Sequence, residues 1–276
     1  MQRKTWFELH DHRLFPNFLR DLMTDGLEAM WNARDIYGPV APRLRRALAE
    51  AGTDRIIDLC SGGGGPWSKL SRNLSENGES APAILLTDKY PNHQAFQSIR
   101  VATGNAVDFH PEPVDAMCIP PELVGFRTMF TTLHHFTPGE ARAILKDAFD
   151  QGQGIAIFDT ARCDLRTLLA VCLVPLAALV LVPRIRPFRW SRIFWNYCLP
   201  VIPFTLWFDG VMSCLRSYSH ADLWESTAEF ISEGYRWEVG EERGKLVNIT
   251  YLVGYPVRDG EREVAELELV GMEEPA

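Results

Sequence analysis

The chain lacks the paired cysteines that build zinc sites and small disulfide-linked domains. Its six cysteines lie scattered at positions 60, 118, 163, 172, 198 and 214, and no two of them form a Cys-x-x-Cys pair. This spacing indicates neither a zinc site nor a disulfide framework. The charged N-terminus also lacks the apolar run of a secretory signal. We therefore expect reduced thiols and a cytoplasmic protein.

A surplus of positive charge is also absent. The 276 residues carry a formal net charge of −8, which argues against broad binding to a phosphate backbone. Outside residues 184–195 there is no basic patch with interleaved aromatic residues, so we expect no nucleic-acid partner. With 46% hydrophobic and 23% charged residues, the composition is that of an ordinary globular protein, either one large domain or one domain with a sizeable insertion.

Short apolar runs alternate with helical patterns along the first 160 residues. Strands are expected at 55–60, 83–88, 126–136 and 154–160, with a further short strand or loop closing at 114–117. Helices are expected at 13–36, 40–51, 66–74, 91–102 and 138–150. Residues 235–241 and 246–257 read as an antiparallel pair at one sheet edge, and the acidic tail from 259 is expected at the surface. This order predicts an α/β fold whose mostly parallel sheet is covered on both faces.

Four consecutive glycines stand in the stretch "RIIDLCSGGGGPWSKL", from Arg55 to Leu70. Glycines directly after a first strand let a ligand approach the main chain, and the next helix offers free backbone amides. A phosphate-binding P-loop is excluded because no Lys-Ser or Lys-Thr pair follows the last glycine in register. A dinucleotide fingerprint is excluded because its third glycine would fall on Trp67, which disfavours an NAD-linked reductase.

The segment "DLCSGGGG" resembles the acid-x-Gly-x-Gly-x-Gly motif of class I S-adenosylmethionine-dependent methyltransferases, with Cys60 in place of the first glycine. Asp88 falls where that family has the acid that binds the ribose, and "VDAM" falls where an Asp-Ala pair meets the adenine. The resemblance covers roughly residues 50–160. It implies S-adenosylmethionine as cofactor and a Rossmann-like sheet of seven strands, mostly parallel with an antiparallel edge strand. The cofactor-binding residues that it implies are Asp58, Cys60, Gly62, Gly64, Asp88, Lys89, Asp115, Ala116 and Thr131.

Two of these acids have other interpretations that stay open. Asp88 could serve only as a helix cap. Asp115 could be an ordinary loop acid, and Asp108 is its rival for the adenine contact.

Two adjacent histidines, His134 and His135, follow the fourth strand and lie beside the expected cofactor site. Methyl transfer from a sulfonium is a direct displacement, so alignment of the reactants supplies much of the acceleration. A hydroxyl or an activated ring carbon additionally needs a base, and an imidazole titrates near neutrality. We predict His135, ahead of His134, as that base. The alternative, in which one ring is simply hydrogen-bonded inside the protein, stays open.

The N-terminal stretch "FELHDHR" gathers several side chains that bind metals elsewhere: Glu8, His10, Asp11 and His12. Neighbouring residues cannot all face one ion unless the segment is extended. We therefore expect this segment to be part of a lid over the active site and expect no metal. N-terminal helices of the resembled family often close over the cofactor, and Trp31 or Tyr37 could contribute there.

An apolar insertion follows the fifth strand. Residues 167–183 are uncharged, 184–190 are basic, and 193–208 are again apolar. Prolines within these runs argue against two uninterrupted membrane-spanning helices. Three interpretations stay open: a cap that shapes a pocket for a lipophilic or aromatic acceptor, a core or homodimer contact, and peripheral attachment to a membrane. The polar groups downstream that could orient a substrate are Asp209, Arg216 and Tyr218.

These observations predict a class I methyltransferase built from four segments. Residues 1–52 form an N-terminal helical lid, 53–160 the cofactor-binding core, 161–234 the apolar cap, and 235–276 the last strands and the tail. The predicted activity is direct transfer of a methyl group from S-adenosylmethionine to a small hydrophobic or aromatic molecule. The alternative is an accessory protein that binds the cofactor without turnover and associates with a membrane.

Overall fold

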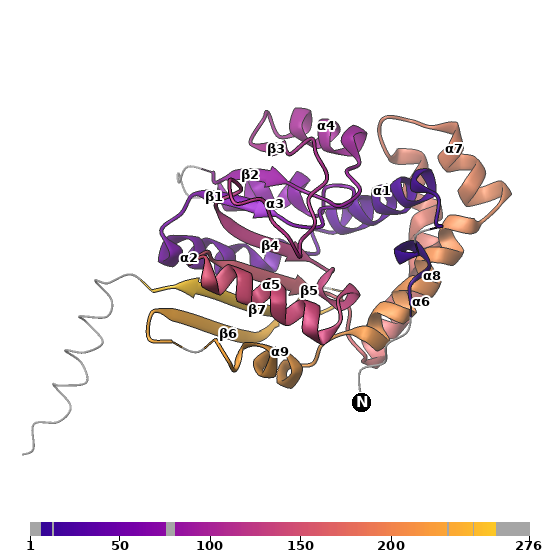
Figure 1. The fold of residues 1–276 in the computed structure, drawn as a ribbon. Helices are drawn as coiled ribbons and strands as arrows, with labels where there is room; N and C mark the ends of the chain where they lie inside the picture. Colours follow the sequence, from indigo (N-terminus) through magenta and orange to yellow (C-terminus); the bar gives the residue numbers. More distant parts are fainter. Residues whose placement is uncertain (1–6, 13, 76–80, 231, 245, 258–276) are drawn as a thin grey trace, which may run out of the picture.

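The computed structural model describes residues 7–12, 14–75, 81–230, 232–244 and 246–257, so the tail from Asp259 lies outside the described residues. Its centre is a seven-stranded sheet in the order β3-β2-β1-β4-β5-β7-β6 (Figure 1). Strands β1 to β5 are parallel, β7 is antiparallel to β5, and β6 is antiparallel to β7. The strands are β1 (Arg55–Asp58), β2 (Ala83–Leu86), β3 (Val107–Phe109), β4 (Phe126–Phe130), β5 (Ile155–Asp159), β6 (Tyr235–Glu242) and β7 (Ile249–Pro256).

Helices cover both faces of this sheet and bury an apolar core on each. One core surrounds Trp67 and Phe96, and the other contains Met129 and Leu145. The predicted α/β sheet, mostly parallel and covered on both sides, is therefore confirmed. The covering helices are α2 (Ala41–Ala51), α3 (Trp67–Leu74) and α4 (His93–Ala102) on one face, and α5 (Pro138–Asp150) and α9 (His220–Thr227) on the other.

Local sequence signals set the ends of several helices. Helix α2 ends at Gly52, whose φ of 67° is left-handed and is adopted by glycine without strain. Helix α3 begins directly after Pro66, whose ring favours the first turn of a helix. Helix α5 begins with a capping box in which Thr137 and Glu140 exchange side-chain-to-backbone hydrogen bonds. These signals explain why the helices expected at 40–51, 66–74 and 138–150 are confirmed.

A further group of helices lies beside the sheet, next to the ends of β4 and β5 (Figure 1). Leu22 and Met23 of the N-terminal helix share an apolar cluster with Ala178, Ile202 and Leu206 of the insertion. The N-terminal helix and the insertion therefore pack on each other. The group consists of α1 (Asn17–Ala33), α6 (Leu165–Leu181), α7 (Trp190–Ile193), the π-helix η5 (Phe194–Cys198) and α8 (Val201–Arg216).

Two details of the sheet differ from the sequence-based expectation. The third strand is Val107–Phe109, whereas 114–117 is a loop with one isolated bridge between Asp115 and Cys118. Strand β4 ends at Phe130 because Thr131 takes up a left-handed backbone with φ of 50°. The histidine pair then lies in a 3-10 turn, η3 (Leu133–His135). The antiparallel strand β7 is second from the edge, since β6 pairs outside it.

The apolar insertion does not break at every proline. Helix α6 continues through Pro175, whereas the second run breaks before α8 at Pro200, so these runs do not form two uninterrupted helices, as predicted. Leu165–Arg184 is long and apolar enough to cross a membrane, and Trp190–Cys198 with Val201–Arg216 would be a second such run, bent by 71°. Length and composition alone do not distinguish a membrane helix from a core helix.

Candidate active site

The loop after β1 is fastened by the carboxylate of Asp58. Its Oδ1 accepts a hydrogen bond from Thr128 Oγ1 on β4, and its Oδ2 accepts one from Ser61 Oγ, both at 2.6 Å. Burial of Asp58 raises its pKa to about 7, although both hydrogen bonds act in the opposite direction. Asp58 therefore fixes the start of the glycine loop. Its predicted approach to the ammonium group of a ligand stays a prediction.

Four residues of this loop have a left-handed backbone. The φ angles of Gly62, Gly64 and Gly65 are 57°, 103° and 56°, and that of Cys60 is 56°. Glycine has no Cβ to clash in this region, whereas another residue there costs about 1–2 kcal/mol. Cys60 stands where the resembled family has its first glycine. Cys60 thus has a left-handed backbone although it carries a side chain, and this conformation is strained.

Two of the glycines are required by the protein's own packing. A Cβ on Gly63 would lie 2.6 Å from the carbonyl oxygen of Thr24 in α1. A Cβ on Gly64 would overlap Cδ1 of Ile99 in α4. Helix α1 therefore packs directly on the loop, and the flanking helices account for part of the glycine run.

A polar stripe along α1 faces the loop. Asn32 donates from Nδ2 to the carbonyl oxygen of Gly65 at 3.0 Å, and Asp25 accepts from Asn92 Nδ2 at 3.1 Å. Burial raises the pKa of Glu28 to about 7. The apolar positions of this segment predicted a helix, and the resemblance implied a lid. The helical spacing of its polar positions is the signal that would have predicted the contact with the loop. The stripe consists of Asp21, Asp25, Glu28 and Asn32.

Asp88 joins the end of β2 to the same loop. Its Oδ2 accepts the backbone N–H of Gly62 and its Oδ1 accepts that of Tyr90, both at 2.7 Å. The side chain is partly covered, and burial raises its pKa. A carboxylate oxygen can accept a second hydrogen bond. A sugar hydroxyl could therefore still donate to Asp88 in this arrangement.

Lys89 and Asp115, which the sequence assigned to the cofactor, lie together. Lys89 Nζ donates to Asp115 Oδ2 at 2.6 Å, and the N–H of Met117 donates to Oδ1 at 3.0 Å. The hydrogen bond from Lys89 is the main cause that lowers the pKa of Asp115. Ala116 beside it is buried. The rival acid Asp108 is exposed in β3 and lies 3.5 Å from Arg100 instead.

Thr131 lies at the end of β4 and contacts two hydroxyl groups. Its Oγ1 is hydrogen-bonded to the hydroxyl of Tyr37, and it lies 3.0 Å from Oγ1 of Thr160. The ring of Tyr37 is buried and packs edge-on against Phe130, while Trp31 packs edge-on against Tyr37. Tyr37 therefore belongs to the core behind β4, and burial raises the pKa of its hydroxyl.

The two adjacent histidines have different surroundings. His134 is buried, and its Nδ1 lies 2.7 Å from Asp159 Oδ2. Burial alone would lower the pKa of His134, but the charge and hydrogen bond of Asp159 raise it above its ordinary value. The side chain of His135 is 19% exposed, and its Nδ1 lies 3.0 Å from Asp11 Oδ2. His135 is thus the more accessible of the two candidate bases.

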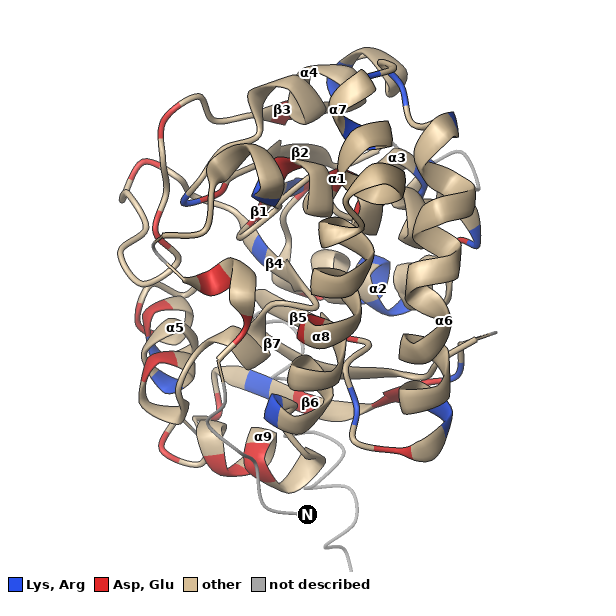
Figure 2. Cartoon of the chain, turned by 90° about the vertical axis from the view of Figure 1, so that its right-hand side faces the viewer, with Lys and Arg blue, Asp and Glu red and all other residues tan. Residues whose placement is uncertain are grey.

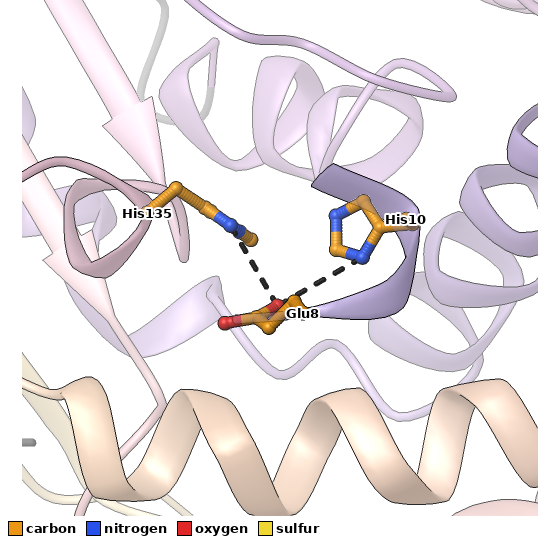
Figure 3. A group of neighbouring side chains, drawn as sticks. All are labelled: Glu8, His10 and His135. Atoms are coloured by element: carbon orange, nitrogen blue, oxygen red, sulfur yellow. Dashed lines mark ion pairs between the residues drawn. The ribbon is translucent and has the colours of Figure 1, made fainter. Parts of the chain in front are cut away.

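Residues 8–11 of the N-terminal segment lie against His135 (Figure 3). The buried Glu8 carboxylate has its Oε2 3.6 Å from His135 Nδ1 and 3.8 Å from His10 Nδ1. These three side chains are spaced closely enough to hold a metal ion. Positive charge is already present, however, because Arg216 Nη1 lies 3.5 Å from Glu8 Oε1. We therefore interpret the group as an ionic contact that holds the segment in place.

The three predicted substrate residues hold this N-terminal segment and the histidine turn. Asp209 Oδ1 accepts the N–H of Leu9 at 2.7 Å, and its Oδ2 lies 2.8 Å from His10 Nδ1. Burial alone would lower the pKa of His10, but its hydrogen bond to Asp209 and the nearby acids raise it above its ordinary value. Arg216 donates to the carbonyl oxygens of His134 and His135, at 3.1 and 2.6 Å.

Tyr218 completes the group by donating to the carbonyl oxygen of Phe136 at 2.8 Å. A direct contact of Asp209, Arg216 or Tyr218 with substrate stays a prediction. Their shared position beside His135 could not be read from the sequence, because nearly 200 residues separate the N-terminal segment from α8.

No protein-family model and no curated protein matches the chain. Among solved structures, it is similar to human N-acetylserotonin methyltransferase in complex with S-adenosylmethionine, with 11% identity, a TM-score of 0.49, and coverage of 88% of this chain and 57% of that one. It is similar to the methyltransferase SibL in its apo form, with 14% identity, a TM-score of 0.46, and coverage of 79% and 55%. It is also similar to the methyltransferase domain of a bacterial CtHen1, with 11% identity, a TM-score of 0.46, and coverage of 79% of this chain and 98% of that one.

The chain spans little more than half the length of the first two of these proteins. Its own strand order places β7 antiparallel between β5 and β6, and an acid-and-glycine loop follows β1. The chain has a Rossmann-like α/β fold with a mostly parallel sheet of seven strands. Identities of 11–14% leave the reaction and the substrate to be argued from the residues of this chain.

Proposed function

We propose that this protein is an S-adenosylmethionine-dependent methyltransferase that acts on a small hydrophobic or aromatic molecule. The observation that carries the proposal is the junction of Asp88 with the glycine loop, where the carboxylate accepts the N–H of Gly62 at 2.7 Å. In open α/β sheets, ligands bind beyond the carboxyl ends of the strands. The junction brings an acid and bare backbone together at that edge of the sheet.

The acids around the glycine loop suit a positively charged cofactor. Burial raises the pKa of Asp21, Glu28, Asp58 and Asp88, so the protein alone compensates their negative charge poorly. A ligand with a sulfonium and an ammonium group would supply the missing positive charge. The phosphates of a dinucleotide would instead be repelled. This charge distribution supports S-adenosylmethionine over NAD.

The proposed base is His135. Bound S-adenosylmethionine would supply an electrophilic methyl group on its sulfonium. Asp11 holds His135 Nδ1 at 3.0 Å, and Arg216 Nη1 holds the same carboxylate oxygen at 3.0 Å. Nε2 of His135 is then the nitrogen that would accept the acceptor's proton, while the bound cofactor would supply the methyl group. Orientation of the two reactants supplies most of the acceleration.

The proposed acceptor is apolar because the insertion, whose helix α8 contacts the histidine turn, is rich in apolar side chains. Arg216 at the end of helix α8 donates to the carbonyl oxygen of His135. Earlier in the same helix, Ile202 and Leu206 belong to an apolar cluster. This neighbourhood favours an aromatic or lipophilic acceptor over a strongly polar one.

The test uses S-adenosylmethionine with a deuterated methyl group. The purified protein is incubated with a metabolite extract, and the aqueous and organic phases are searched for the label by mass spectrometry. We expect label in an apolar product, and we expect His135→Ala to lower turnover without lowering cofactor affinity. Label in a polar product would contradict the proposed acceptor class. Cofactor binding without any labelled product would favour the non-catalytic accessory protein.

A further inference from the structure

Helix α6 exposes a continuous row of large apolar side chains. Between 58% and 74% of each of these side chains is accessible to solvent, and they recur every three or four residues, so they lie on one side of the helix. A helix on the surface of a water-soluble protein usually carries polar residues on that side. The row consists of Leu165, Leu169, Leu173, Leu176 and Val180.

The opposite side of α6 already supplies the packing that the fold needs. Ala178 and Val182 are buried, and Val174 packs against the cluster that α6 shares with α1 and α8. Gly210 of α8 lets the two helices approach closely, since a Cβ there would lie 3.0 Å from Val171. Packing inside the protein thus accounts for the apolar residues on the buried side of α6 but not for its exposed row. Only 22% of its apolar window is buried.

The apolar surface continues beyond α6. Aromatic side chains on the following segment are 43–78% exposed, and η5 and α8 of that segment contact α6. Large exposed apolar areas mark interaction sites on soluble proteins. Helix α6 has no charged residue after Arg166 in its first turn, and Figure 2 shows it tan along most of its length. The exposed aromatic residues are Phe188, Trp190, Phe194, Tyr197 and Phe204.

Positive charge gathers at one end of this surface. Arg184 and Arg186 are exposed and Arg189 is partly exposed, all in the connection that leads from α6 to Trp190. Residues 165–208 contain no Asp or Glu, although the whole chain has 36 acidic residues among 276. The stretch that forms this surface therefore contributes no acid of its own, and Asp21 of α1 is an acid that interacts with Arg189.

We propose that this surface, formed by α6, the basic connection 184–189 and the exposed aromatic residues, docks on an anionic phospholipid membrane. The apolar row would enter the boundary between headgroups and acyl chains, the arginines would meet lipid phosphates, and Trp190 would lie at the interface. This inference is independent of the proposed methyl transfer, because it rests on the outer side of the insertion.

The geometry favours a helix that lies in the membrane surface over one that spans the bilayer. The buried side of α6 packs on α1 and α8, and behind them lies the buried ion pair of Asp25 with Arg192 at 2.6 Å. A spanning position would bring these charges towards the hydrocarbon, where they are costly. Contact through one side of α6 leaves them inside the protein.

Lipid also suits this surface better than a second copy of the chain does. A symmetric dimer through the same surface would place arginines near arginines. Since residues 165–208 provide no carboxylate, such a dimer would leave these charges without partners in the interface. Phosphate groups above an apolar layer provide both kinds of contact.

The test is flotation of the full chain with phosphatidylcholine vesicles that either contain or lack phosphatidylglycerol. We expect flotation with the anionic vesicles, weaker binding to the neutral ones, and weakening by salt. The double variant Leu169→Glu/Leu173→Glu should bind at least about tenfold more weakly, because it places two charges in the apolar layer. Replacing Arg184, Arg186 and Arg189 with Gln should weaken binding by about a hundredfold.

The matched control is Val124→Glu. Val124 is also exposed, at 52%, but it precedes the amino end of β4 and lies away from the insertion. This variant should float like the wild type, and circular dichroism should show that all variants are folded. Failure of the wild-type chain to bind anionic vesicles would overturn the proposal. Unchanged vesicle binding by the Leu169→Glu/Leu173→Glu variant would also overturn it. So would sedimentation showing that the wild type is a dimer and this variant a monomer while both bind vesicles equally.

Discussion

At the scale of single residues, Asp88 combines two tasks that a neutral side chain cannot perform together. Its two oxygens accept the backbone N–H groups of Gly62 and Tyr90. We expect Asp88→Asn to weaken S-adenosylmethionine binding by about 1–3 kcal/mol, since the amide nitrogen cannot accept a hydrogen bond from either the backbone or a sugar hydroxyl. Calorimetric titration measures the change. Asp108→Asn, on exposed strand β3, is the control, and equal affinities for both variants would remove Asp88 from the site.

Glu28 gives a second prediction at this scale, and it concerns stability. Burial raises its folded-state pKa from an ordinary 4.5 to about 7. A raised pKa means that stability present below about pH 4.5 is lost as the pH rises through 7. The free energy of unfolding of the wild type should therefore fall by on the order of 3 kcal/mol through this group as the pH rises. Glu28→Gln should not show this fall. Urea unfolding at pH 5, 6, 7 and 8 measures the two slopes.

The control for this pH dependence is Glu140→Gln. Hydrogen bonds with Thr137 lower the pKa of Glu140, so this carboxylate stays ionised throughout pH 6–8. Its replacement should shift stability by a constant amount across that range. Parallel pH profiles for the wild type and Glu28→Gln would show that Glu28 is not the titrating group.

Some site residues could be predicted from the sequence because strand ends determine their position. Asp58 ends β1 and Asp88 follows β2 by two residues, and parallel strands bring their carboxyl ends to one edge. Glu8 and Asp209 could not be placed in this way. Their partners lie in distant parts of the chain, and no local periodicity indicates which turn a folded N-terminal segment will contact.

At the scale of secondary-structure elements, the contact of α1 with the glycine loop is the least expected feature. The loop's glycines predicted a close approach, but glycines alone do not indicate whether a ligand or another helix makes it. At Gly63 the neighbour is another helix, because the missing Cβ leaves room for the carbonyl oxygen of Thr24 in α1. Helix boundaries were more accessible to prediction, since caps such as Gly52 and Thr137 act through local geometry.

This contact predicts a clear difference between two glycines. Gly63→Ala should destabilise the protein by about 1–3 kcal/mol, because its Cβ would lie 2.6 Å from Thr24 O and displace α1. Gly139→Ala should be neutral or slightly stabilising, since Gly139 lies in α5 with no atom within 4 Å of the added Cβ. Chemical unfolding compares the two. Equal free energies of unfolding would mean that α1 does not press on the loop.

At the scale of the whole molecule, one buried ion pair joins the insertion to the rest of the chain. Arg192 Nη2 donates to Asp25 Oδ2 at 2.6 Å, and Asp25 also accepts from Asn92 at the start of α4. The side chains of Arg192 and Asp25 are only 3% and 6% exposed. Asp25 therefore contacts both the insertion and the sheet domain, in addition to the contacts made by Asp209 and Arg216, and the three parts should unfold together.

Arg192→Met tests this linkage. The change leaves the Asp25 carboxylate buried without its cation, which should cost about 3–5 kcal/mol of unfolding free energy. Asp25→Asn in the same chain should recover part of the loss by removing the charge. Arg189→Met, three residues away and partly exposed, should change stability by less than about 0.5 kcal/mol.

Because the sheet depends on this link, Arg192→Met should unfold in one common transition at a lower urea concentration than the wild type. Far-ultraviolet circular dichroism and tryptophan fluorescence should both report this transition. Two separate transitions in the wild type would instead mean that the insertion unfolds independently of the sheet.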